Sequence, residues 1–303
     1  MKHVSVLLNE AVDGLNIKPD GVYVDATVGY GGHSEKILQK LKKGKLFAFD
    51  QDIDAINYVS KKFKDYDNFT LIHSNFSNIK EELERRGISK VDGILFDLGV
   101  SSPQIDDGSR GFSFMKDAEL DMRMNRENEL DAKTVINEYS LERLIGIFYR
   151  YGEEKFSKPI AKKIIDSRPI NTTLELVDVI TSAVPVKYAK LNHPERRIFQ
   201  AIRIEVNKEL NVLDDTLNQA VDLLNSGGRI SVITFHSLED RITKQIFNKY
   251  SKIDDLVKGL PEIPEQYMPK IKLINKKPIL PTIEEMSSNA RSKSAKLRIV
   301  ERI

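Results

Sequence analysis

The sequence predicts an α/β fold in which a Rossmann-like parallel sheet is interrupted by an inserted all-helical domain. Short apolar segments alternate with helical patterns over residues 22–98, as in a parallel sheet with crossover helices. This alternation then stops, a purely helical pattern takes its place, and the strand-and-helix pattern resumes near Leu210. The sheet domain is predicted to comprise residues 1–107 and 211–303, and the helical insertion residues 108–210.

Composition limits the class of protein. A chain of 303 residues with 40% hydrophobic content can bury one large core, or a core and a smaller domain. No apolar run is long enough to cross a bilayer and no secretory leader is visible, so we expect a cytosolic protein without a membrane partner. Cysteine is absent, which excludes disulfides and thiolate metal sites. With a net charge of +2, attraction to nucleic acid must come from local patches.

The first predicted strand, at residues 22–24, runs into the glycine loop DATVGYGGHS at residues 25–34, and a helix containing Ile37 and Leu38 follows. Such a loop presents backbone N–H groups and a helix N-terminus to a ligand. The pattern G-x-G-x-x-G of dinucleotide sites is not met, because position 34 is Ser34. An acid four residues before the first glycine, here Asp25, resembles the first motif of S-adenosylmethionine-dependent methyltransferases. An unoccupied glycine turn is the alternative.

Two later strands also end in acids. Residues 45–50 are predicted as the second strand, and Asp50 at its end is a candidate for binding both ribose hydroxyls of an adenosine; a solvated acid is the alternative. The third strand, residues 69–72, is followed by Phe76, and the fourth, residues 91–98, contains Asp97 near its end. Because the carboxyl ends of parallel strands meet at one edge, Asp25, Asp50 and Asp97 together indicate a cofactor site there.

The insertion begins with a loop at residues 106–126 that is rich in Gly, Asp and Arg, and helical patterns fill residues 134–210, with loops at 167–173 and 184–194. On the helix that starts near Pro194, one polar face is either solvated or turned toward RNA; it carries Arg196, Gln200, Arg203 and Asn207. Phe199 lies on an adjacent apolar face.

The end of the chain returns to the sheet pattern. A long helix from Leu210 is expected to stop at Gly227, and residues 229–235 form the fifth strand. His236 follows at the carboxyl edge, Ser237 is a candidate cap for the next helix, and the alternation of Leu297 and Ile299 suits a terminal strand. No cluster of His or acids has metal-ligand spacing, so no catalytic metal is expected.

Nine segments together resemble a specific family, the bacterial small-subunit (16S) ribosomal RNA cytosine N(4)-methyltransferases. In order, they are SVLLNEAV, DATVGYGGHS, DLGVSSPQ, RGFSF, LDMRM, YGEE, FQAIRIEVN, FHSLEDR and ARSKSAKLR. The resemblance covers almost the whole chain, and it implies a class I methyltransferase sheet with a helical substrate-recognition domain. The implied methyl donor is S-adenosylmethionine, and the implied substrate is a cytidine near the decoding centre, in 16S rRNA or the 30S subunit. Oligomeric state is left open, a homodimer included.

The resemblance assigns the cofactor contacts to Gly31, Gly32, His33, Asp50, Phe76, Asp97 and Gln104. The acceptor for the amino proton is expected to be Asp97, with a main-chain carbonyl around Ser102 as its rival. Candidate contacts to the target base and its RNA are Arg110, Phe112, Phe114, Arg123, Arg196, Phe199 and His236. Packing and surface charge are the alternative roles of these seven residues.

Three functions are compared on these residues. Amino methylation of cytidine leads, because methylation at pyrimidine carbon 5 commonly needs a cysteine nucleophile, which this chain lacks. Nicotinamide-dependent oxidation is opposed by Ser34. A non-catalytic RNA-binding factor of ribosome assembly that retains a cofactor fold remains the alternative.

Overall fold

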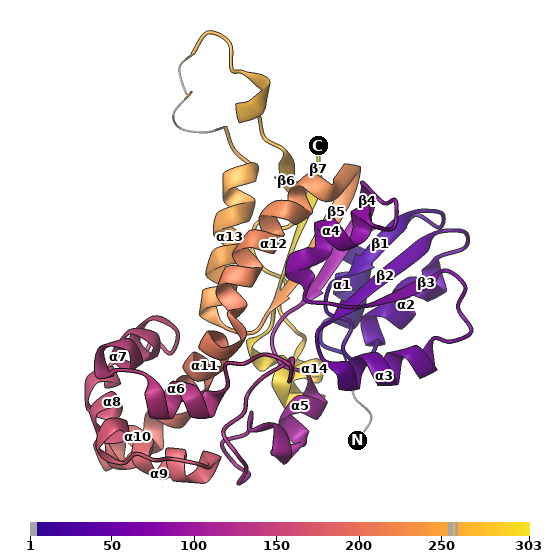
Figure 1. Ribbon diagram of the computed structural model, residues 1–303. Coiled ribbons are helices and arrows are strands. Elements are labelled where there is room, and N and C mark those ends of the chain that lie inside the picture. The colour runs from indigo at the N-terminus through magenta and orange to yellow at the C-terminus, as the bar shows by residue number, and fades with distance from the viewer. Residues whose placement is uncertain (1–4, 254–256, 258–259) are drawn as a thin grey trace. The chain divides into compact units, whose positions relative to one another are not determined.

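The computed structural model describes residues 5–253, 257 and 260–303. The chain forms two compact units (Figure 1). One, which we call the sheet unit, contains the chain up to Gly99 and from Leu210 to Ile303, and the other, the helical unit, contains Val100–Glu209. The helical unit starts before the predicted residue 108, because Val100 packs against its core and Ser101 caps its first helix.

The sheet unit contains a seven-stranded sheet in the order β3-β2-β1-β4-β5-β7-β6. Strands β1 to β5 pair in parallel, whereas β7 runs antiparallel to both β5 and β6. The strands are β1 Val22–Asp25, β2 Lys45–Asp50, β3 Phe69–His73, β4 Val91–Asp97, β5 Leu224–Thr234, β6 Ile271–Leu273 and β7 Lys296–Arg302. The predicted Rossmann-like sheet is therefore confirmed. Strand order reverses between β1 and β4, the position at which such sheets bind ligands outside the carboxyl ends of their strands.

Helices cover both faces of this sheet because its strands are apolar on both sides. On one face, β1 and β2 side chains pack with Val12, Ile37 and Val59 of three helices; these are α1 Leu8–Gly14, α2 Gly32–Lys40 and α3 Ile53–Lys62. On the other, Leu83, Leu217 and Phe247 come from α4 Ile79–Glu84, α12 Glu209–Leu223 and α13 Ser237–Tyr250. A further short helix, α14 Ile283–Ser288, precedes β7.

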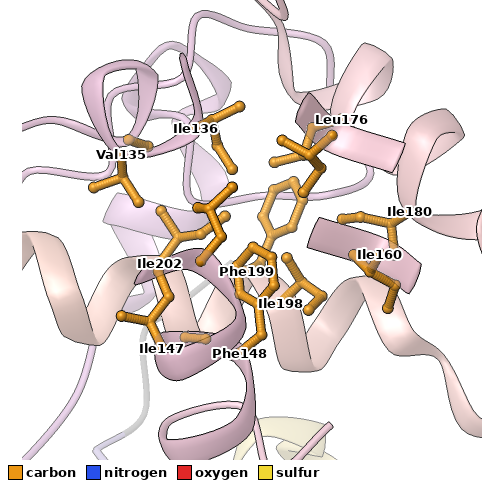
Figure 2. Packing of buried hydrophobic residues seen from close by; sticks show 14 of the residues in the cluster. Val135, Ile136, Ile147, Phe148, Ile160, Leu176, Ile180, Ile198, Phe199 and Ile202 are labelled. Atoms are coloured by element: carbon orange, nitrogen blue, oxygen red, sulfur yellow. The ribbon is translucent and has the colours of Figure 1, made fainter. Parts of the chain in front are cut away.

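The helical unit has its own core of aliphatic and aromatic side chains, with Phe148, Ile198 and Ile202 fully or almost fully buried (Figure 2). These side chains come from amphipathic helices whose apolar residues recur at helical spacing. The helices are α5 Ser102–Asp106, α6 Ala132–Glu138, α7 Leu141–Arg150, α8 Ser157–Asp166, α9 Thr173–Ser182, α10 Val186–Asn192 and α11 Pro194–Asn207.

Three local predictions were wrong. The helix α12 ends at Leu223 rather than at Gly227, because Leu224 already pairs with Val91 of the sheet. Residues 184–194, expected to be a loop, contain helix α10. The side chain that caps α13 belongs to His236 and not to Ser237. The terminal strand expected around Leu297 is confirmed as β7.

Among the described residues, no helix is both long and apolar enough to span a membrane.

Candidate functional site

The glycine loop is held by Asp25 at the end of β1. One carboxylate oxygen accepts the Thr27 N–H at 3.1 Å and the other accepts the Ser34 hydroxyl at 2.7 Å. Burial raises the pKa of Asp25 to about 6, although both hydrogen bonds act to lower it. Ser34, the residue that breaks the dinucleotide pattern, therefore fastens the first turn of α2 to the strand that precedes the loop. Asp25 fixes the shape of the loop from inside the fold.

Two glycines give the loop its path. Gly29 has φ 49° and Gly31 has φ 76°, a left-handed region that favours glycine. Around Gly31 the fold is tight, since a Cβ there would lie 2.6 Å from Cε2 of Phe63. Around Gly29 it is open, since a Cβ would meet no atom within 4 Å. The loop is thus packed against α3 on one side and accessible beside Gly29, where a ligand can approach the backbone.

Asp50 ties the second strand to the same loop. One of its oxygens accepts the Gly29 N–H at 2.9 Å and the other accepts the Asp52 N–H at 2.9 Å. Burial raises the pKa of Asp50 to about 6. Each carboxylate oxygen has a second lone pair, so this geometry fits the ribose-binding role that we proposed for it.

His33 and Asp97 lie beside each other at the start of α2 and the end of β4. His33 is buried, with Nε2 3.1 Å from the Val6 carbonyl oxygen and Nδ1 3.5 Å from Oδ2 of Asp97. A carbonyl can only accept, so Nε2 carries a proton. Nδ1 and Oδ2 of Asp97 therefore share a hydrogen bond only when one of these two atoms also carries a proton.

The other oxygen of Asp97, Oδ1, is buried and has no hydrogen-bond partner among the described residues. Burial, reinforced by the negative charges of Asp25 and Glu239, holds the pKa of Asp97 well above its usual range. A buried acceptor without a partner is costly unless a ligand supplies the donor. Oδ1 is the atom at which we expect a bound donor group to be received.

Glu239 is the residue of this region that the sequence analysis missed. It is buried, and one of its oxygens accepts the Phe235 N–H at 2.8 Å and the His236 N–H at 3.2 Å. His236 in turn accepts from the Glu239 N–H, so the two side chains form a reciprocal cap at the start of α13. The spacing of His236 and Glu239, three residues apart after a strand, was the available signal. The ring predicted to contact substrate thus has a capping role.

Phe76 follows β3 in the 3₁₀ helix η1 Phe76–Asn78. Its half-buried ring meets Phe96 of β4 edge to face, with ring centroids 5.8 Å apart. The Phe76 side chain is thereby fixed beside the strand that carries Asp97, and its contact with an adenine stays a prediction.

Gln104 and Ser102 belong to the helical unit, in α5. The Gln104 side-chain oxygen accepts the Ser101 N–H at 2.9 Å, and the Ser101 hydroxyl accepts the Gln104 N–H at 3.4 Å. This capping box fixes the orientation of Gln104, which is largely buried. Ser102 is the first residue of α5. Their roles toward a cofactor and a proton remain predictions.

The structure gives internal roles to two of the candidate cations. Arg110 is buried and donates to the carbonyl oxygens of Arg123 and Met124 at 3.0 and 3.1 Å. Arg123 pairs with Asp121, with Nε 2.8 Å from Oδ1. Of the three predicted arginines, Arg196 alone is exposed. The prediction that Arg110 reaches RNA does not fit its burial.

The candidate stacking rings are also internal. Phe112 and Phe199 are buried in the helical core, and Phe114 packs edge to face on Phe199 at 5.9 Å. Stacking of either buried ring on a base would require the core to open, so their role is packing. The polar face of α11 is engaged too, because Asn207 accepts the Met124 N–H and donates to the Met122 carbonyl, both at 2.8 Å.

Because Arg110 is buried and Arg196 is exposed, replacing them should have different effects on the stability of the protein. Replacing Arg110 by glutamine should lower the free energy of unfolding by about 1–3 kcal/mol, because two buried carbonyl oxygens lose their donors. Replacing the exposed Arg196 by glutamine should change it by less than about 0.5 kcal/mol. Urea denaturation of both variants measures the difference, and equal stabilities would contradict the buried role of Arg110.

The chain is similar to a known protein family, to a named relative and to solved structures. The model of the MraW methylase family matches residues 1–303. The protein named ribosomal RNA small subunit methyltransferase H from Exiguobacterium sibiricum is 54% identical over 307 residues, covering 100% of this chain and 98% of the relative. Solved structures with similar folds include an rRNA methylase from Streptococcus thermophilus (13% identity, TM-score 0.45, 99% of each chain). Another is TrmN from Thermus thermophilus (11% identity, TM-score 0.43, 98% of this chain and 48% of that one).

Proposed function

The chain belongs to the MraW methylase family, and we propose that it methylates the 4-amino group of a cytidine in 16S ribosomal RNA, near the decoding centre, with S-adenosylmethionine as donor. Its sheet is that of a class I methyltransferase. The observation that carries the proposal is the arrangement at the carboxyl edge of this sheet, where a left-handed glycine loop and three strand-end acids converge. The relative at 54% identity is named for the small ribosomal subunit, which supports the same substrate here.

The residues of the sheet unit fit this donor. Beside Gly29 the backbone is open, Asp50 offers carboxylate lone pairs to ribose hydroxyls, and Asp97 has a buried acceptor that lacks a donor. We assign Gly31, Gly32, His33, Asp50, Phe76, Asp97 and Gln104 to donor binding. When bound, S-adenosylmethionine supplies a methyl group on a positively charged sulfur.

The difficulty of the reaction lies in the acceptor, because the lone pair of the cytosine amino nitrogen is delocalised into the ring. A hydrogen-bond acceptor placed at the amino group favours the nucleophilic form and removes a proton after transfer. In this step the nitrogen lone pair forms the bond to the methyl carbon, the carbon–sulfur pair stays on sulfur, and a proton leaves the nitrogen. We propose that Asp97 accepts this proton, with the main-chain carbonyl around Ser102 as the rival acceptor.

The experiment is a methylation assay followed by nucleoside mapping. Purified protein and donor with a labelled methyl group are incubated with small subunits from cells that lack this gene. Label is expected in one cytidine, on the exocyclic nitrogen. Label on a carbon or a ribose would contradict the proposal. RNA binding without labelling of any ribosomal substrate would favour a non-catalytic assembly factor.

A further inference from the structure

Four of the nine arginines of the helical unit cannot serve as RNA contacts without breaking internal bonds. Arg168 donates to the carbonyl oxygens of Ile136 and Tyr139, at 2.7 and 2.6 Å. Arg203 forms a two-pronged pair with Glu209, at 2.8 and 2.9 Å. Together with Arg110 and Arg123, these side chains stabilise the unit itself. The cations that remain for a phosphate ligand are therefore mainly lysines.

Helix α8 carries three of these lysines on its outer face. Its inner face is formed by Ile160, Ala161 and Ile164, which have no exposed surface. Lys158, Lys162 and Lys163 are exposed on the opposite side. Lys158 and Lys162 are one turn apart, so their ammonium groups lie along the same stripe of the helix.

Helix α10 adds a second pair. Lys187 and Lys190 are exposed, whereas Tyr188 between them points into the unit and is 9% exposed. Lys155, just before α8, has its ammonium 4.8 Å from the centre of the Tyr188 ring, and Phe156 packs on the same ring at 4.5 Å. The start of α8 and helix α10 are thus joined through Tyr188.

These lysines are not neutralised within the fold. Over the described part of the chain, none of Lys155, Lys158, Lys162, Lys187 and Lys190 forms an ion pair with a carboxylate. The buried Glu154, which precedes Lys155 in the sequence, is engaged with the Tyr188 hydroxyl at 2.7 Å and with Arg197 at 3.6 Å. A group of exposed cations without counter-charges attracts a polyanion. When the two bind, counterions that were condensed on the polyanion are released.

We propose that this lysine surface, made of Lys155, Lys158, Lys162, Lys187 and Lys190, binds the phosphate backbone of the RNA substrate. Backbone contacts of this kind position an RNA without reading its sequence. The identity of the RNA rests on the proposed function. The evidence for the surface itself is that its five lysines are exposed and form no ion pairs with the described residues. Arg110 and Arg123, chosen from the sequence for this role, have internal partners instead, and the contact of Arg196 with RNA stays a prediction.

Two double variants test the surface, Lys158→Gln with Lys162→Gln, and Lys187→Gln with Lys190→Gln. The matched control is Lys42→Gln with Lys43→Gln, which removes two exposed charges from the sheet unit near the start of β2. Filter binding to 16S rRNA is measured without donor over a series of salt concentrations. Each surface variant should bind at least about tenfold more weakly at low salt, and its log–log salt slope should be smaller by about 1.4–1.8. The control should retain the wild-type slope.

Further measurements separate the possible outcomes. Binding of S-adenosylmethionine and kcat at saturating RNA should be unchanged in both surface variants, while KM for RNA rises. If the wild type binds RNA by this surface but methylates nothing, the proposed function fails and the surface stands. If the wild type methylates RNA and the surface variants keep the slope of the control, the surface proposal is overturned. Loss of binding to intact subunits but not to free rRNA would also overturn it, in favour of a ribosomal protein.

Discussion

Replacing Asp97 by asparagine is expected to lower kcat for RNA methylation by roughly 10²–10⁴-fold, the usual contribution of a positioned proton acceptor. Asparagine has nearly the same shape, but its amide nitrogen cannot accept a proton. In the structure, Oδ1 of Asp97 is the buried acceptor without a partner, and His33 Nδ1 lies 3.5 Å from the other oxygen. Single-turnover kinetics with saturating donor separates this loss from any change in donor affinity.

Asp92 provides a matched control on the same strand. It lies at the opposite end of β4, accepts the Val22 N–H at 3.0 Å and pairs with Lys18. Replacing Asp92 by asparagine should lower stability modestly and leave single-turnover rates unchanged. If Asp97→Asn methylates RNA at the wild-type rate, the proton acceptor is another group, with the carbonyl around Ser102 next in line.

The pH dependence follows from the same residue. Burial, with Asp25 and Glu239 nearby, holds the pKa of Asp97 well above its usual range, so the carboxyl is protonated below that raised pKa. A protonated carboxyl cannot take the amino proton. The rate of methyl transfer should therefore rise with pH through the raised pKa and then level off, and Asp97→Asn should lack this rise.

Replacing Gly31 by alanine is expected to destabilise the protein by about 2–4 kcal/mol and to weaken donor binding by at least about tenfold. Two effects add. Alanine is strained at φ 76°, and its Cβ would lie 2.6 Å from Cε2 of Phe63. Since Phe63 is buried in the core of the sheet unit, the loop has to move instead of the ring. Thermal unfolding and calorimetric titration with S-adenosylmethionine measure the two losses.

Gly87 is a control that has the backbone strain of Gly31 without its steric clash. It has φ 74°, almost that of Gly31, but a Cβ there would meet nothing within 4 Å. Gly87→Ala should therefore cost only about 1–2 kcal/mol, from backbone strain alone, and leave donor binding unchanged. Equal destabilisation of the two variants would show that Phe63 does not restrict the loop.

The strand-end acids were predictable because alternating apolar segments fix where parallel strands end, and all their carboxyl ends share one edge. Asp25, Asp50 and Asp97 were found in this way. The short strand β6 was missed, because three residues give no periodicity. Burial of charged groups was missed for a different reason. Arg110 and Arg196 look alike in a sequence, and only the path of the chain between Arg110 and Met124 shows that one guanidinium caps buried carbonyl groups.

The path of the chain through the sheet also bears on how the protein folds. β4 and β5 are neighbours, with Val91 paired to Leu224, yet the whole helical unit is synthesised between them. During translation the edge of β4 that pairs with β5 therefore stays unpaired until the helical unit and β5 have emerged from the ribosome. The other edge of β5 stays unpaired until β7 has been synthesised. Open strand edges favour aggregation. Early folding of the independent helical core shortens the effective loop that closes β4 onto β5 and lowers its entropic cost.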